Sequence, residues 1–133
     1  MSDEIILPIR ISRNFVIKHR EWYFIYGTDV QNKSTFGQAW HVANEPNSFG
    51  VFVLRKVCSN SIFFMDHSPE DFADLNRSID AIPRDQPIIP IRKVGEGFSQ
   101  MKYLAPKLFA HMTERLNELR YPNITIDYTR QYE

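Results

Sequence analysis

The sequence predicts an α/β protein, a three-layer α/β/α sandwich around a mostly parallel sheet. Two observations support this prediction. Apolar segments rich in β-branched and aromatic residues, typical of buried strands, alternate with segments whose apolar residues recur at helical spacing. The chain also has 133 residues, the usual length of one domain. We therefore treat residues 1–133 as a single domain, with an N-terminal arm at 1–10 and a C-terminal strand or tail at 121–133.

The first half of the chain contains two predicted central strands. "IILPIRI" is expected to be an edge strand or an extended arm, because Pro8 interrupts it. Ser12 is the expected N-cap of a short helix in "ISRNFVIKHRE". "EWYFIYG" is typical of a central strand buried on both faces, and "GVFVL" of a second buried strand. Between them, the spacing in "TFGQAWHVAN" predicts a helix that ends at Asn44 and Pro46.

The second half continues the alternation. "SIFFM" is either a short strand or a packed loop. Ser68 is the expected N-cap of the next helix, with Pro69 at its first position and Asp71 completing a capping box. "PIIPI" is predicted to be a third strand at a sheet edge, because it contains two prolines. A last long helix should begin near Ala105, and "NITIDY" should be a half-exposed strand. The buried stripe predicted for the helix that Ser68 caps is Phe72, Leu75, Ile79 and Ile82.

Composition narrows the classes of function. Sixteen basic and sixteen acidic residues give no net charge, which disfavours non-specific nucleic-acid binding. A basic cluster from Arg10 to Arg20 keeps that class as a minor alternative. The chain has neither a signal-peptide pattern nor an apolar run that could span a bilayer, so we expect a cytoplasmic protein with no membrane partner. The histidines are far apart and Cys58 is the only cysteine, so we expect no metal, and we expect no cofactor.

Two polar loops follow predicted strands. They are "GTDVQNKSTFGQA" and "KVGEGFSQ". In open α/β sheets, ligands bind outside the carboxyl ends of the strands. We therefore expect the residues of these two loops to lie together. The glycines of the second loop could bring backbone N–H groups close to an anion at a helix N-terminus, or they could simply form a tight turn. The candidate ligand-binding residues of these loops are Thr28, Asp29, Gln38, Gly95, Glu96, Gly97 and Ser99.

Several motifs together resemble a known pattern. They are "YGTD" with Gly27, the pair Gln38-Ala39, "EPNSFG", Arg55-Lys56, and "VGEGFSQMKYLAP". On these motifs the chain, from Ile11 to Leu119, resembles small, largely uncharacterised phage and bacterial proteins with a macro-domain-like pattern. Two glycines of that pattern are replaced, the first by Phe36 and the second in the stretch Phe98-Ser99. These replacements add side chains where the backbone of a macro domain approaches its ligand.

The resemblance implies a macro-domain-like sheet and a phage-encoded module that binds a nucleotide or an ADP-ribose-type ligand. It adds Asn47 and Lys56 to the candidate ligand-binding residues. Whether the protein is an enzyme stays open, and no catalytic residue is assigned. The alternative is a protein-interaction or inhibitor protein on the same fold, for example a phage anti-host or anti-defence factor that binds a host protein in the host cytoplasm. For Asn47, a structural role in the turn at Pro46 is the favoured reading.

Overall fold

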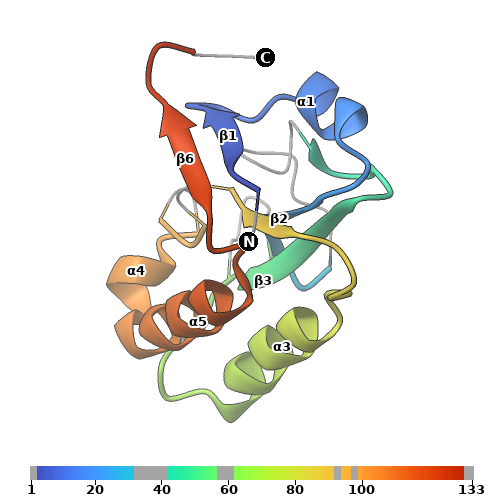
Figure 1. The fold of residues 1–133 in the computed structure, drawn as a ribbon. Coiled ribbons are helices and arrows are strands. Elements are labelled where there is room, and N and C mark those ends of the chain that lie inside the picture. The colour runs from blue at the N-terminus through green and yellow to red at the C-terminus, as the bar shows by residue number, and fades with distance from the viewer. Residues whose placement is uncertain (1–2, 32–41, 57–61, 92–93, 97–98, 131–133) are drawn as a thin grey trace.

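The computed structural model describes residues 3–31, 42–56, 62–91, 94–96 and 99–130, and mixes helices with strands as an α/β protein does (Figure 1). Most of the helix predicted in "TFGQAWHVAN" lies outside these residues. Gln38 and Gly97 also lie outside them, as does the side chain of Lys56. In chain order, the elements are β1 (Ile5–Pro8), α1 (Arg13–Lys18), β2 (Tyr23–Asp29), β3 (Ser48–Lys56), β4 (Ile62–Phe63), α3 (Pro69–Asp80), β5 (Ile88–Pro90), α4 (Met101–Leu104), α5 (Pro106–Leu119) and β6 (Ile124–Asp127).

The larger sheet has four strands in the order β4-β3-β2-β5. Strand β2 pairs in parallel with both β3 and β5, so "EWYFIYG" forms a central strand as predicted. Strand β5 pairs with β2 alone in this sheet, which fits the edge position that its prolines predicted. The segment "SIFFM" contributes a two-residue strand, β4, that runs antiparallel to β3. The sheet is therefore mixed.

Strands β1 and β6 form a separate parallel pair, in which Ile5 lies opposite Ile124 and Pro8 opposite Asp127. Both strands were predicted, β1 with its proline at an edge. One backbone hydrogen bond, from Tyr121 N to Ile88 O at 2.9 Å, joins the segment before β6 to β5. The two-stranded sheet is thereby anchored beside the larger one.

Two apolar clusters cover opposite faces of the larger sheet, because alternate residues of a strand point to opposite sides. Ile25 belongs to the cluster formed with α3 and α5. Its neighbours Phe24 and Tyr26 belong to the cluster formed with α1, β1 and β6. Helices thus cover one face, and among the described residues the other face is covered by a helix and a pair of strands.

The helix starts follow the sequence signals, with one exception. Phe15 N donates to Ser12 Oγ at 3.1 Å, and Asp71 N donates to Ser68 Oγ at 3.2 Å, so both serines cap as predicted. The reciprocal half of the capping box is absent, because Ser68 N donates to Met65 O instead. The carboxylate of Asp71 is bound elsewhere, as described below.

The buried face of α3 is narrower than predicted. Leu75, Ile79 and Ile82 are buried, but Phe72 is exposed and its ring lies 4.8 Å from that of His111 on the surface. The last predicted helix, α5, begins at Pro106 with Ala105 as its N-cap, as expected, and the short α4 precedes it. Pro106 occupies the first turn of α5, as expected from its missing N–H. Within the described ranges, no helix is both long and apolar enough to cross a bilayer.

Candidate functional site

The described parts of the connections that follow β2 and β5 include residues on opposite faces of the sheet. Val42, in the connection from β2 to β3, belongs to the cluster on the face of α1. After β5 the chain continues into α4 and α5, whose residues Met101, Leu108 and Met112 belong to the cluster on the other face. Neighbouring parallel strands with connections on opposite faces form a topological switch point, the usual ligand position in open α/β sheets. The carboxyl ends of β2 and β5 are therefore the candidate site.

The end of β2 carries two of the predicted site residues, and both are inside the protein. Thr28 is 2% exposed and Asp29 is fully buried. The register against β3 shifts between them, with Thr28 opposite Phe52 and Asp29 opposite Leu54. Such bulges redirect side chains at strand ends. Gln31 N donates to Asp29 Oδ2 at 3.2 Å, which is the local turn bond that an aspartate in a loop commonly accepts.

The glycine of "EPNSFG" is explained by the neighbouring strand. A Cβ on Gly50 would lie 2.5 Å from Thr28 Cγ2 and 3.3 Å from Tyr26 Cζ. Since real Cβ atoms do not approach other atoms so closely, a side chain at position 50 would displace Thr28. Gly50 is thus required by strand packing at this site.

The second predicted loop, "KVGEGFSQ", is called the late loop below, and its described residue Val94 lies beside the end of β2, as the sequence predicted. A Cβ on Gly27 would lie 3.7 Å from Val94 Cγ1, which places Val94 over β2. Gly95 has a φ of +81°, a conformation that other residues rarely adopt. The space where its Cβ would be is occupied by Met112 Cε at 2.9 Å and by the ring of Phe109 at 3.1 Å. The missing side chain of Gly95 therefore gives room to α5 and not to a ligand.

The other described residues of this loop are also engaged. Lys102 Nζ donates to Glu96 Oε1 at 3.1 Å, and this hydrogen bond raises the pKa of Lys102. Ser99 is buried, and Met101 N donates to its Oγ at 3.4 Å. Lys102 N donates to the carbonyl of Gly95 at 3.1 Å. Among the described residues of this loop, the charge presented to solvent is the carboxylate of Glu96, which stays exposed.

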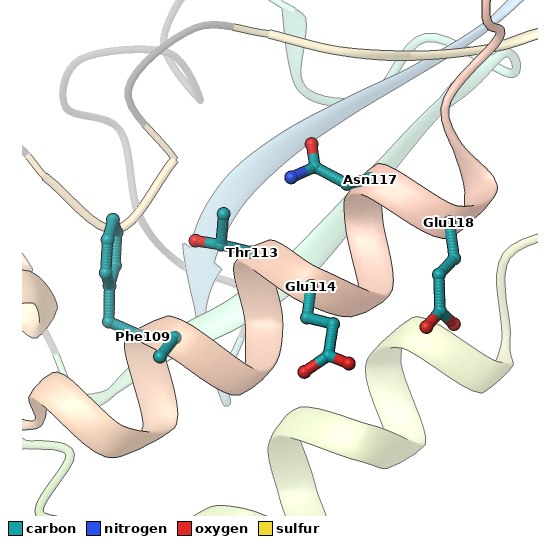
Figure 2. Close-up of a pocket in the computed structure, with 6 residues that line it drawn as sticks. Phe109, Thr113, Glu114, Asn117 and Glu118 are labelled. Atoms are coloured by element: carbon teal, nitrogen blue, oxygen red, sulfur yellow. The ribbon is translucent and has the colours of Figure 1, made fainter.

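An open hollow of about 600 Å³ runs along α5 next to this loop. Figure 2 shows Phe109, Thr113 and Asn117 projecting from one side of the helix, and Glu114 and Glu118 from the other. Phe109 is the residue shared with the late loop, since its ring also lies against Gly95. The hollow therefore begins where the loop packs on α5.

The N-terminus of α5 already holds an anionic group. Leu108 N donates to Asp66 Oδ1 at 2.9 Å, and Lys107 N donates to Asp66 Oδ2 at 3.2 Å. Free N–H groups at a helix start normally bind a capping side chain or an anion. We expected the helix after the late loop to offer such groups to a ligand. That expectation is wrong for α5, because the carboxylate of Asp66 occupies them.

Asn47 lies at the opposite end of the strands, just before β3 begins. Its Nδ2 donates to the carbonyls of Val16, His19 and Trp22 at 2.9–3.2 Å. Its Oδ1 accepts from Arg20 Nη1 at 2.6 Å. Since Asp29 ends the same pair of strands, Asn47 is a full strand length away from it. Its hydrogen bonds tie the turn after α1 to the start of β3.

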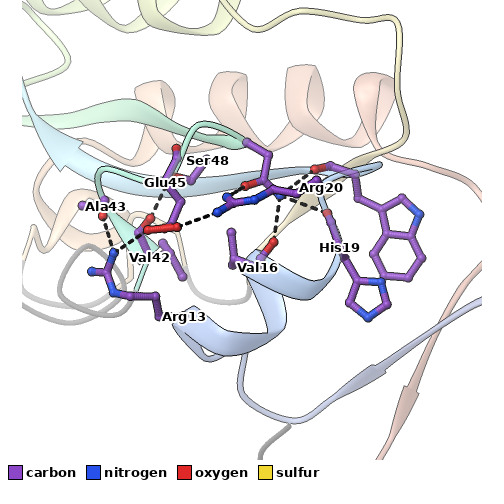
Figure 3. A network of polar contacts seen from close by, with 10 residues as sticks. Arg13, Val16, His19, Arg20, Val42, Ala43, Glu45 and Ser48 are labelled. Atoms are coloured by element: carbon purple, nitrogen blue, oxygen red, sulfur yellow. Dashed lines mark hydrogen bonds and ion pairs between the residues drawn. The ribbon is translucent and has the colours of Figure 1, made fainter.

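Glu45 completes this network (Figure 3). Arg20 Nη2 and Arg13 Nη1 each lie 3.1 Å from its carboxylate. The hydrogen bond from Arg20 lowers the pKa of Glu45 below its ordinary value. Ser48 Oγ donates to the carbonyls of Val42 and Glu45. The motif "EPNS" therefore organises the turn before β3, the role that we favoured for it. The network also engages Arg13 and Arg20 of the basic cluster.

A second ionic network links β3 to α3, and the sequence did not predict its ion pairs. Arg55 Nη1 lies 2.6 Å from Asp74 Oδ2, and Arg55 Nε donates to Asp71 Oδ1 at 3.2 Å. Met65 N donates to Asp71 Oδ2 at 3.0 Å. The half-buried Arg55, near the end of β3, is thus paired with carboxylates at i and i+3 of α3, and no local signal in the sequence marks this pairing. Across the described ranges, no group of three or more His, Cys, Asp or Glu residues could hold a metal ion.

The comparisons with known proteins point to one family. Residues 7–115 match a family described as "Family of unknown function (DUF7831)". Neither a curated protein nor a solved structure matches the chain. Since the family match extends over most of the sequence, the protein belongs to the family of unknown function DUF7831.

Proposed function

We propose that the protein is a macro-domain-like module that binds a nucleotide or an ADP-ribose-type ligand at the carboxyl ends of β2 and β5. The observation that supports this proposal most directly is the topological switch point between these two strands. The proposed ligand class follows from the sequence resemblance to macro-domain-like proteins. The late loop, with Val94 packed over Gly27, would form one wall of the site.

The finer fold assignment belongs to the same proposal. The hydrogen bond between Tyr121 and Ile88 brings the β1–β6 pair to the free side of β5. If the pairing continues there, the two sheets become one sheet of mostly parallel strands, with β4 as the antiparallel edge. Helices or other layers on both faces would complete a sandwich of the macro-domain-like kind.

The charges at the site predict a specific mutational effect. Glu96 is exposed on the late loop, and a negative charge there opposes the phosphates of a nucleotide. Glu96→Gln removes that charge and also releases Lys102 from its ion pair. At an effective dielectric constant between that of water and that of a protein surface, one charge about 7 Å away changes affinity by roughly 3–50-fold. Glu96→Gln should therefore tighten binding of ADP-ribose by that factor.

Isothermal titration calorimetry with ADP-ribose, NAD, and cyclic and linear dinucleotides tests the proposal. Glu118→Gln, at the far end of α5, is the matched control and should leave binding unchanged. Binding to neither the wild type nor Glu96→Gln, with any of these ligands, would refute the proposed ligand class. Binding that Glu96→Gln leaves unaffected would place the ligand away from the late loop.

A second candidate function is protein interaction without catalysis, for example as a phage anti-host or anti-defence factor. The observation that favours it is the packing of Gly95 against α5, which fills the space that a ligand-binding glycine would leave open. Exposed aromatic side chains, Tyr128 at 69% and Tyr103 at 73%, offer contact area to a host protein. Cross-linking mass spectrometry from host cells should then recover a single partner through these tyrosines. Its loss in a Tyr103→Ala, Tyr128→Ala variant would support this function.

A further inference from the structure

The hydroxyl of Tyr26 is a polar group without a partner in an apolar setting. Tyr26 lies in the middle of β2, and only 4% of the residue is exposed. Its ring belongs to the apolar cluster on the face of α1. Buried tyrosine hydroxyls normally form a hydrogen bond. In the described part of the chain, the Tyr26 hydroxyl forms none.

The oxygen of Tyr26 is nevertheless not sealed inside the protein. Within the described ranges, every fully enclosed side-chain nitrogen or oxygen has a hydrogen-bond partner. Because the Tyr26 oxygen has none, it belongs to the small part of this residue that is exposed. Tyr26 therefore buries its ring and presents its hydroxyl. Ligand sites use such single polar groups, set in apolar walls, to orient what they bind.

The surroundings of the ring place this hydroxyl toward the carboxyl end of β2. A Cβ on Gly50 would lie 3.3 Å from Tyr26 Cζ, the ring carbon that carries the hydroxyl, and 2.5 Å from Thr28 Cγ2. The hydroxyl end of the ring and the side chain of Thr28 therefore meet in the space that Gly50 leaves. Thr28 precedes Asp29, the last residue of the strand. The ligand site proposed above lies at this end of β2.

Tyr26 and Thr28 lie on the side of β2 opposite to the late loop. Val94 packs against Gly27, the residue between them. Because alternate residues of a strand point to opposite faces, Tyr26 and Thr28 point away from Val94. A ligand held between the two connections would therefore have the late loop on one side and the hydroxyl of Tyr26 on the other.

We propose that Tyr26 is a ligand-contacting residue, and that its hydroxyl donates a hydrogen bond to a sugar or phosphate oxygen of the bound nucleotide. This role rests on the proposed function and adds a residue that is not among the candidates predicted from the sequence. Burial raises the pKa of Tyr26 above its ordinary value, so the hydroxyl keeps its proton at neutral pH and can donate it. The bound ligand satisfies a hydroxyl that has no partner in the described part of the protein.

Tyr26→Phe separates this role from a structural one, because it removes the oxygen and keeps the ring. A hydroxyl without a partner in the protein contributes nothing to the fold through hydrogen bonding. The variant should therefore have the urea midpoint of the wild type or a higher one, although the residue is almost fully buried. It should weaken the binding of ADP-ribose by about 3–10-fold, the usual effect of losing one hydrogen bond. A lower urea midpoint would assign the hydroxyl to the fold and overturn the proposed contact.

Tyr23→Phe is the matched control, because it removes the same atom near the other end of β2. The hydroxyl of Tyr23 already donates to Asp85 Oδ1 at 2.7 Å. Tyr23→Phe should therefore leave nucleotide binding unchanged. If it weakened binding as much as Tyr26→Phe, the loss would reflect a general change in β2 and would count against a contact from Tyr26.

Isothermal titration calorimetry of the wild type and both variants with ADP-ribose, NAD and adenosine completes the test. A loss of affinity in Tyr26→Phe with adenosine as well assigns the contact to the sugar of the nucleoside. A loss with ADP-ribose or NAD alone assigns it to the phosphates or the second sugar. Equal affinities of the wild type and Tyr26→Phe would overturn the contact and leave the proposed function standing. A wild type that binds none of the nucleotides named here or above would overturn both.

Discussion

Replacing Asp71 by alanine should lower the free energy of unfolding by about 2–4 kcal/mol. The side chain is 8% exposed. Its Oδ1 accepts hydrogen bonds from Nε and Nη2 of Arg55, and its Oδ2 accepts one from Met65 N. Hydrogen bonds to a charged group contribute about 1.5–3 kcal/mol each when they are buried. The sum overstates the loss, because Arg55 keeps Asp74 as a partner and its side chain is 22% exposed to water.

Urea unfolding followed by circular dichroism measures this effect, with Asp71→Asn as the matched control. Asparagine retains an oxygen that can accept from Met65 N but loses the charge that faces Arg55. It should therefore be destabilised by about half as much as alanine. If Asp71 acted only as a residue of a capping box, the alanine variant would lose about 1 kcal/mol or less. A loss that small, shared by both variants, would refute the role assigned to the network with Arg55.

Three further predictions concern stability. Gly95→Ala should cost about 1–3 kcal/mol in urea unfolding, because alanine is strained at a φ of +81° and its Cβ would meet Met112; a neutral effect would show that the loop can rearrange. Asp66→Ala should cost about 1–2 kcal/mol by removing the cap of α5, and Asp66→Asn distinctly less, since one oxygen remains to accept. The pKa of Glu45 is lowered, so its contribution is present above the unfolded pKa near 4.5 and is lost as the pH falls through the folded value. Glu45→Gln should therefore flatten the decline of stability below that pH, whereas an unchanged slope would contradict the pairing with Arg20.

Much of the fold could be predicted from local signals. Ser12 and Ser68 cap their helices because their hydroxyls reach N–H groups only three residues away. The uninterrupted run of aromatic and β-branched residues in β2 predicted a central strand. The position of β2 between β3 and β5 confirms that prediction. Pro106 marked the start of α5, since a missing N–H is tolerated only in the first turn of a helix.

The errors share a cause, which is that long-range partners leave no local signal. Asp71 stands where a capping box would place it, yet its carboxylate turns to Arg55, sixteen residues earlier in the chain. Asp66 had no evident role, because the helix that it caps begins about forty residues later. The buried stripe of α3 stops short of Phe72, because the helical period tells which residues share a face but not where the core ends. The binding roles of the candidate site residues remain predictions.

The pairing of β1 with β6 sets an order of events during synthesis. Ile5 and Leu7 are buried in the folded protein, and their strand leaves the ribosome before every other described element. Its only hydrogen-bonded neighbour among the described strands, β6, follows every other described element. Until β6 arrives, the apolar residues of β1 have an unpaired edge, which is the kind of surface that captures strands of other chains. Newly made chains that stall before β6 should therefore be the aggregation-prone species of this protein.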